Sequence, residues 1–297
     1  MLTYDGFGEY LKKADIASFY GFSALRKMRG DSVIPYANDI FYFLNHKGVA
    51  DAFEAYVKRS QALRTLQVEF EKAGRYRAAC CAEVAPIDRE QYNLALLLSF
   101  ICTSHRFDIL ESLVRFLRMP CSAPREVLSI GYGTGYELKL VFQEMPGWRP
   151  LAFDNSPDSH QYASDLLGFF GYPTDGLRQE FFPLDSASRI GAYRERFGKV
   201  ILCELLEHLD DPALALRAMR AVLHRDGLLF CTMAVNIAQE DHVYLYRSAD
   251  EARDQVMECG FYIVEEILAP VVILPFASAK RAQMFEKGNY VCIAKPT

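Results

Sequence analysis

The feature that most constrains the fold of this 297-residue chain is an alternation of strand-like and helix-like segments that begins after Pro124. Short apolar runs bounded by turn residues are typical of buried strands, and helix-start signals lie between these runs. The runs predict strands at residues 126–130, 150–153, 180–183, 199–203 and 228–232. Because strands that alternate with helices pair in parallel through crossover connections, the pattern predicts a parallel sheet covered by helices on both faces.

The segments between and after these strands carry residues that begin helices. Helices are expected to start near Thr134, Ser156, Ser188, Asp211 and Ser248. Ser248 with Glu251 three residues later forms a capping-box pattern, and Gly260 is a typical residue for the end of that helix. The last two strands, expected at residues 262–268 and 290–295, are close enough in sequence to form an antiparallel pair.

The first third of the chain carries helical signals only. Apolar residues recur at helical spacing in the segment that ends at Gly74, a typical helix-ending residue. Asp88 and Gln91 form a capping-box pattern ahead of a segment that is apolar on most sides, as in a helix buried between others. The sequence therefore predicts an all-helical cap or substrate-binding domain over residues 1–120 and one doubly wound α/β domain over residues 121–297.

Three glycines spaced two apart follow the first predicted strand, in the segment VLSIGYGTGYE at residues 127–137. Glycines between a strand and a helix let the backbone approach a ligand closely at the helix N-terminus. The dinucleotide fingerprint G-x-G-x-x-G needs a glycine where this chain has Tyr136, and the phosphate-loop pattern needs a G-K-S/T that does not follow. Gly131, Gly133 and Gly135 therefore match neither pattern fully, and a dehydrogenase is a minor alternative.

Acidic residues follow the next two predicted strands. Asp154 ends the second strand, where a carboxylate beside a glycine loop can accept hydrogen bonds from both hydroxyls of a ribose. Asp185 ends the third strand, from which it can reach the far end of the same nucleoside. Because the carboxyl ends of parallel strands lie along one edge of a sheet, the glycines and the two aspartates together predict a nucleoside-binding site at that edge.

On these motifs, residues 125–297 resemble a class I S-adenosylmethionine (SAM)-dependent methyltransferase. The matching segments are the glycine loop, LAFDNS with the ribose acid, FFPLD with the adenine-side acid, and KVILCELLEHLDDPALALRAMRAVLHRDGLLFCTMAVN over the fourth and fifth strands. The resemblance implies a Rossmann-like, doubly wound, seven-stranded α/β sheet with an antiparallel last strand. It also implies SAM as the cofactor.

The same resemblance implies which residues bind the cofactor. They are Gly131, Tyr132, Gly133, Gly135, Asp154, Asn155, Asp185, Cys203 and Glu204. The chain departs from the family at Ser129, where many members carry an acid that helps to hold the methionine part of the cofactor. Tyr136, Glu137 or a residue of the helical cap is expected to take over that role.

Four residues near the ends of the fourth and fifth strands form a candidate catalytic and metal-binding group, namely Glu204, Glu207, His208 and His242. Two carboxylates and two imidazoles suit a divalent metal such as Mg, Mn, Fe or Zn. A similar group binds metal in small-RNA 2′-O-methyltransferases, and a related one occurs in ubiquinone-pathway O-methyltransferases. A metal there would bind and acidify an acceptor hydroxyl. The alternatives are His208 or His242 as a metal-free general base, or a purely structural role for the group.

The charge of the chain bears on the methyl acceptor. The net charge is −5 and no long basic run is present, which argues against a nucleic acid or an anionic membrane as partner. The leading prediction is therefore a small-molecule acceptor enclosed by the helical cap, methylated on oxygen or nitrogen. The alternatives are an RNA-terminal 2′-O-methyltransferase, which the metal-like group suggests, and a catalytically silent module that binds SAM.

Other features bear on the location of the protein. The eight cysteines include no C-x-x-C pair, and Asp5 and Glu9 lie where a signal peptide would be basic and then apolar. The longest apolar stretch, residues 94–102, is too short to cross a bilayer. These features predict a cytoplasmic protein. A homodimer is compatible with the sequence, which does not fix the oligomeric state.

Overall fold

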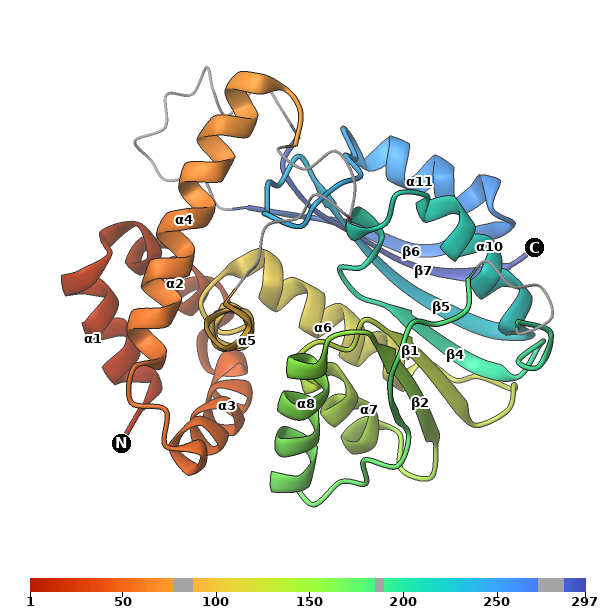
Figure 1. The fold of residues 1–297 in the computed structure, drawn as a ribbon, viewed down its shortest axis with the longest axis horizontal. Coiled ribbons are helices and arrows are strands. Elements are labelled where there is room, and N and C mark those ends of the chain that lie inside the picture. Colours follow the sequence, from red (N-terminus) through yellow and green to blue (C-terminus); the bar gives the residue numbers. More distant parts are fainter. Residues whose placement is uncertain (77–87, 185–189, 272–285) are drawn as a thin grey trace.

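A seven-stranded sheet forms the C-terminal part of the computed structural model, which describes residues 1–76, 88–184, 190–271 and 286–297 (Figure 1). The strand order is β3-β2-β1-β4-β5-β7-β6, and β7 runs antiparallel to both β5 and β6 while the pairs from β3 to β5 are parallel. The strands are β1 (Glu126–Ile130), β2 (Arg149–Asp154), β3 (Leu177–Gln179), β4 (Phe197–Leu202), β5 (Leu223–Val235), β6 (Phe261–Pro270) and β7 (Gly288–Pro296). The predicted fold class, a Rossmann-like α/β sheet with an antiparallel last strand, is confirmed.

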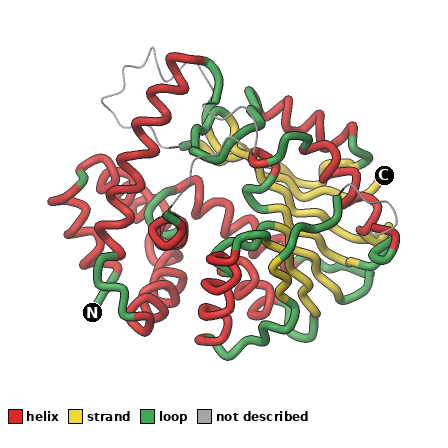
Figure 2. Tube along the Cα trace, in the orientation of Figure 1, coloured by secondary structure: helices red, strands yellow, loops and turns green. Residues whose placement is uncertain are grey.

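Helices lie on both sides of the sheet (Figure 2). Apolar residues of α6, α7 and α8 form one buried cluster with the sheet, and those of α10 and α11 form another cluster on the opposite face. The helices are α1 (Tyr4–Ala14), α2 (Ile16–Arg29), α3 (Ile34–Lys47), α4 (Ala52–Ala73), α5 (Arg89–Ser99), α6 (Ser104–Arg118), α7 (Tyr136–Glu144), α8 (Pro157–Phe169), α10 (Pro212–Val222) and α11 (Ala249–Glu258), with 3₁₀ turns η1 (Gly30–Val33) and η3 (Leu206–His208).

One predicted strand is wrong. The sequence predicts a third strand at residues 180–183, but β3 ends earlier, at Gln179, which pairs with Asp154 at the end of β2. β2 ends at Asp154 and the chain then enters α8, so residues 180–183 have no strand to pair with among the described residues. Phe182 instead packs its ring edge-on against Phe153 at a centroid distance of 5.0 Å, while Phe181 is 74% exposed.

The expected helix starts that fall on described residues are observed within two residues, and four of them carry side-chain caps. The capping oxygens of Asp88, Ser156, Asp211 and Ser248 accept hydrogen bonds from the backbone N–H groups of Gln91, Ser159, Leu214 and Glu251, at 3.1–3.2 Å. Gly74 ends α4 in the left-handed conformation, as its position in the sequence predicts. The helix expected near Ser188 falls outside the described residues.

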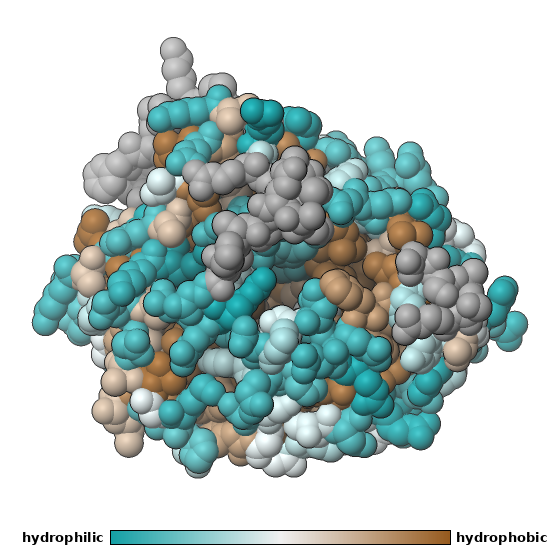
Figure 3. All heavy atoms as spheres, viewed as in Figure 1, coloured by the Kyte–Doolittle hydropathy of each residue, from teal (hydrophilic) through white to brown (hydrophobic). Residues whose placement is uncertain are grey.

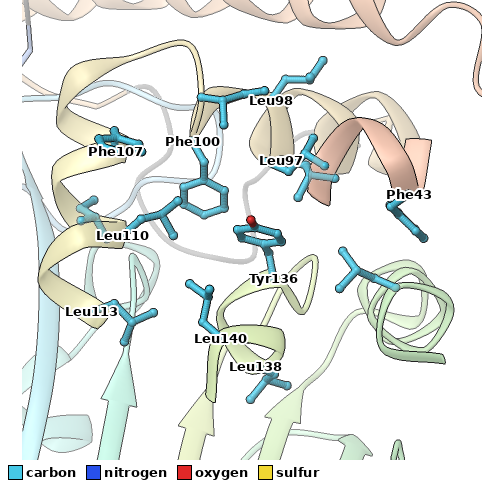
Figure 4. Packing of buried hydrophobic residues seen from close by; sticks show 14 of the residues in the cluster. Phe43, Leu97, Leu98, Phe100, Phe107, Leu110, Leu113, Tyr136, Leu138 and Leu140 are labelled. Carbon is cyan, nitrogen blue, oxygen red and sulfur yellow. The ribbon is translucent and has the colours of Figure 1, made fainter. Parts of the chain in front are cut away.

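The helical N-terminal region and the sheet share a core. Tyr136, the first residue of α7, is fully buried and stacks on Phe100 at a centroid distance of 5.8 Å, surrounded by leucines of α5, α6 and α7 (Figure 4). Polar contacts join the same parts, since Lys139 of α7 pairs with Asp39 of α3. α6 lies against the sheet itself, where the ring centroid of Phe116 is 5.4 Å from that of Phe230 in β5. The division of the chain near residue 120 stays a prediction.

Within the described residues, every helix is too short or too polar to serve as a transmembrane span.

Candidate functional site

The glycine loop lies at the carboxyl edge of the sheet, between β1 and α7. Gly131, Gly133 and Gly135 all have positive φ angles, of 73°, 49° and 76°, a region that L-residues with a side chain rarely adopt. Two of them also lie close to neighbours, because a Cβ on Gly131 would be 3.1 Å from Leu205 and one on Gly133 would be 3.6 Å from Leu96. The loop is thus enclosed between the chain after β4 and helix α5.

Gly135 has a different role from the other two glycines. A Cβ there would lie 2.7 Å from the Cβ and 2.9 Å from the Cα of Ala163, so this glycine lets α8 pack against the loop. We expect Gly135→Ala to lower the free energy of unfolding by about 2–4 kcal/mol, through overpacking added to backbone strain. Urea unfolding, monitored by circular dichroism, measures this change in the free energy of unfolding.

Gly147→Ala is the matched control, since Gly147 has a φ of 83° but a Cβ on it would meet nothing within 4 Å among the described residues. It should lose only the backbone contribution, about 1 kcal/mol. Equal losses in the two variants would contradict the close approach of α8 to Gly135.

Asp154 is held directly against the glycine loop. Its Oδ2 accepts a hydrogen bond from the backbone N–H of Gly133 at 2.9 Å, and its Oδ1 accepts one from Ser156 N–H at 2.9 Å. Burial raises the pKa of this carboxyl, and the two backbone donors oppose that shift. The structure therefore brings together the loop and the acid that the sequence places at the same sheet edge.

The structure describes most of the other residues assigned to the cofactor. Tyr132 is buried, and its hydroxyl lies 2.9 Å from Nδ1 of His160 in α8. Asn155 is exposed directly after Asp154, and Cys203 is partly exposed at the end of β4. Asp185 lies outside the described residues.

Glu204 follows β4 in a strained conformation, with a φ of 51°. Its carboxylate Oε1 accepts a hydrogen bond from the Thr232 hydroxyl at 2.7 Å, and its Oε2 accepts one from Asn289 at 2.6 Å. The Arg106 guanidinium lies 3.0 Å from the same Oε2. Residues of β5, β7 and α6 therefore fix this carboxylate.

Glu207, His208 and His242 come together as a separate group. One ligand atom from each lies within 4.8 Å of the others, and Glu204 is not part of this group among the described residues. Glu207 is fully buried, its Oε1 accepts a hydrogen bond from Ala234 N–H at 3.2 Å, and its Oε2 has no hydrogen-bond partner in the described part of the chain. Three of the four predicted residues thus form a group, and it contains a buried oxygen available to a ligand.

Backbone carbonyls orient both imidazoles of this group. Nδ1 of His208 lies 2.9 Å from the carbonyl of Asp241, and Nδ1 of His242 lies 2.8 Å from the carbonyl of Ile237. A carbonyl can only accept, so each Nδ1 carries a proton, and in a neutral imidazole of this tautomer the lone pair is on Nε2. Burial, with a smaller contribution from His208, lowers the pKa of His242 to about 3. His242 is therefore neutral at physiological pH, the form that binds metal.

Glu207 differs from a surface carboxylate. Burial, followed by the charge of Glu204, raises the pKa of Glu207 well above its ordinary value. A divalent cation close to Glu207, His208 and His242 would offset this cost by pairing with the carboxylate. One carboxylate oxygen and two imidazole nitrogens form a donor set that suits Zn²⁺ and similar metals and leaves a position open. The residues present fit a metal.

The helical region supports the loop that carries His242, a contact that sequence reasoning missed. Gln67 of α4 accepts a hydrogen bond from Ala238 N–H at 2.9 Å and donates one to the carbonyl of Asn236 at 3.0 Å. The ring of Tyr76 lies edge-on to His242, with centroids 5.6 Å apart. These partners are more than 150 residues apart in sequence, so no local pattern indicates them.

Sequence reasoning also missed Arg106, which contacts Glu204. Arg106 of α6 is buried, with its guanidinium 4.7 Å from the centroid of the Phe100 ring. Glu137, in the first turn of α7, forms a hydrogen bond with the Cys203 thiol, and burial raises the pKa of its carboxyl. Arg106, Glu137 and Glu204 therefore form a charged cluster beside the glycine loop.

Comparisons with known proteins agree with this geometry. A family model for a methyltransferase domain matches residues 102–266, which include α6 and every strand from β1 to β5. No curated protein matches the chain in sequence.

Solved structures share the fold at low sequence identity, which shows the fold alone. A mitomycin 7-O-methyltransferase, MmcR, matches with a TM-score of 0.52 and 13% identity, over 82% of this chain and 68% of that chain. The carbon methyltransferase CurJ matches with a TM-score of 0.52 and 16% identity, over 87% and 70%. A SAM-dependent methyltransferase from Aquifex aeolicus matches with a TM-score of 0.50 and 13% identity, over 71% and 100%. With more than half of its length in the family match, the chain belongs to the methyltransferase-domain family and is a class I SAM-dependent methyltransferase.

Proposed function

We propose that this enzyme transfers a methyl group from SAM to a small-molecule acceptor bound between the sheet edge and the helical region. The observation that carries the proposal is the hydrogen bond between Asp154 and the N–H of Gly133, which joins the ribose acid to the glycine loop. On the face seen in Figure 3 the surface is hollowed between the helical region and the sheet, with apolar side chains visible in the hollow. Such a hollow suits a small organic acceptor.

SAM supplies an activated methyl group, and the protein orients the reactants and excludes water. We assign the ribose hydroxyls to Asp154 and the close backbone approach to Gly131 and Gly133. Tyr132, Gly135, Asn155 and Cys203 are proposed to complete the cofactor site, and Asp185, outside the described residues, stays a prediction from the sequence. Leu96 of α5 lies over Gly133, so the helical region covers the loop. This cover supports the exclusion of water from the reacting atoms.

We further propose that Glu207, His208 and His242 bind a divalent cation. When bound, such a cation would lower the pKa of an acceptor hydroxyl, which would favour O-methylation. Glu204 is not included among these proposed ligands, because Thr232, Asn289 and Arg106 already bind its carboxylate.

The competing proposal for the same group is metal-free general-base catalysis. His242 suits it poorly, because its pKa near 3 makes it a weak base. His208 suits it better, because the carbonyl of Asp241 orients its ring and the Asp241 carboxylate lies 3.6 Å from Nδ1. The two proposals differ in whether removal of metal abolishes methyl transfer.

Two other functions are weaker. An RNA-terminal 2′-O-methyltransferase is favoured by the carboxylate–histidine group, but the net charge of −5 gives little attraction for a polyanion. A catalytically silent module would need only the cofactor site. The three glycines and Asp154 do not distinguish it from an enzyme, whereas the buried oxygen of Glu207, unpartnered among the described residues, favours a working centre.

Isothermal titration with SAM, S-adenosylhomocysteine (SAH) and NAD tests the cofactor assignment. We expect SAM and SAH to bind with dissociation constants of about 1–100 µM, a range in which binding free energies are roughly −8 to −5.5 kcal/mol, and NAD to show no binding. NAD binding without SAM binding would contradict the proposal. A screen of small phenols, amines and hydroxy acids for SAH release then tests the acceptor class, with short RNAs as the alternative substrates.

A further inference from the structure

The charged cluster of Arg106, Glu137 and Glu204 lies beside the glycine loop, outside the ribose contacts and the carboxylate–histidine group. It is found where β4 ends, next to the loop, because Leu205 contacts Gly131. Many relatives carry an acid on the first strand, which helps to hold the methionine part of the cofactor. Here that position is Ser129, which is 3% exposed and carries no charge.

Arg106 is a buried cation with a hydrogen-bond donor that is unpaired among the described residues. Its side chain is 9% exposed, one guanidinium nitrogen lies 3.0 Å from Oε2 of Glu204, and its Nε has no hydrogen-bond partner among the described residues. The Glu204 carboxylate also accepts hydrogen bonds from Thr232 and Asn289. A buried guanidinium in this state favours a second anion, since unmade hydrogen bonds to a charged group are costly.

Glu137 is the complementary anion. It lies in the first turn of α7, directly after the glycine loop, and its carboxylate forms a hydrogen bond with the Cys203 thiol. Among the described residues no cation lies within ion-pair distance of it, and burial raises the pKa of its carboxyl. A cationic group bound beside Glu137 would stabilise the charged form.

Tyr136 does not compete for this role. Its side chain is fully buried in the core shared with the helical region, and its hydroxyl faces the carbonyl of Tyr36 at 3.5 Å (Figure 4). Of the candidates to replace the missing acid, Glu137 and a residue of the N-terminal helices are left.

We propose that Arg106 and Glu137 hold the amino-acid end of SAM, with Arg106 on the α-carboxylate and Glu137 on the α-ammonium. The inference rests on the proposed function, and it places the acid on α7 and the guanidinium on α6 instead of on the first strand. The amino-acid end of SAM is a zwitterion, and its two charges are complementary to the guanidinium on α6 and the carboxylate on α7. Asp154, which accepts a hydrogen bond from Gly133 of the glycine loop, then binds the ribose, so different residues hold the two parts of the cofactor.

The test compares two ligands by isothermal titration. SAH has the amino-acid end, whereas 5′-methylthioadenosine has the same adenosine and sulfur without it. We expect wild-type protein to bind SAH at least about 100-fold more tightly than 5′-methylthioadenosine, since two charge-assisted contacts are at stake. In Arg106→Met, SAH affinity should fall by about 100-fold and 5′-methylthioadenosine affinity should stay within about threefold.

Two further variants and two controls sharpen the comparison. Arg106→Lys keeps the charge but not the forked geometry and should lose less SAH affinity, about 10-fold, and Glu137→Gln should lose about 10-fold. Arg115→Met, on the same helix as Arg106 but paired with Glu265 at the surface, and Glu144→Gln, at the far end of α7, should bind both ligands as the wild type does.

Each outcome decides the inference. Wild-type SAH affinity in Arg106→Met overturns it, and so does an equal loss for both ligands, which would indicate a structural role through Glu204. Binding of 5′-methylthioadenosine by the variants shows that the adenosine site is still folded. If the wild type binds neither ligand, the proposed function itself fails, which is a distinct result.

Discussion

Asp154→Ala is expected to weaken SAH binding by about 100-fold or more, because each hydrogen bond between a charged acceptor and a ribose hydroxyl contributes about 1.5–3 kcal/mol. The carboxylate is the only group of the cofactor site that is held by backbone donors on both sides, from Gly133 and Ser156, among the described residues. Its removal would delete the proposed ribose contacts and also the hydrogen bond to the glycine loop. Isothermal titration with SAH gives the affinity.

Asp158→Ala is the matched control. Asp158 lies in the first turn of α8, four residues after Asp154, and is exposed. It should bind SAH as the wild type does and unfold at the same urea concentration. Wild-type affinity in Asp154→Ala would refute the ribose assignment, and a parallel loss in Asp158→Ala would show that α8 as a whole is responsible.

His208→Ala and Glu207→Ala are each expected to lower Zn²⁺ affinity by more than about 100-fold, since loss of an outer partner of a ligand alone typically costs about 10- to 100-fold. The two residues and His242 offer donor atoms within 4.8 Å of one another. Competition titration of purified protein against a fluorescent zinc chelator measures the affinity, and elemental analysis gives the stoichiometry. One zinc per chain is expected for the wild type.

His224→Ala serves as the control, because His224 lies at the start of β5, beside the surface residue Asp226. It should bind zinc as the wild type does. If wild-type protein binds no divalent ion, the metal proposal fails and His208 as a general base gains support. In that case methyl transfer by metal-free protein should be lost in His208→Ala and kept in His224→Ala.

Much of the fold could be predicted because its signals are local. The caps at Asp88, Ser156, Asp211 and Ser248 depend on a side chain reaching a backbone N–H three residues away, which is set by adjacent stereochemistry. The strand at residues 126–130 has the bounds that the sequence predicts, since a continuous apolar run is typical of a strand buried on both faces. Residues 180–183 show the limit, because a strand also needs a partner, and β2 ends at Asp154.

The candidate site divides in the same way. The sequence by itself determined the glycine loop, the acid at the end of β2 and the presence of carboxylates and histidines after β4 and β5, because parallel strands bring their carboxyl ends to one edge. The sequence could not show that Glu207 groups with the two histidines and that Glu204 does not. In the structure, Arg106, Asn289 and Thr232 bind the Glu204 carboxylate, and these residues lie between 28 and 98 positions from Glu204 in the sequence. Only the tertiary structure decides such pairings, because the energy of a buried charge depends on which distant groups surround it, whereas a cap or a strand depends on its neighbours in sequence.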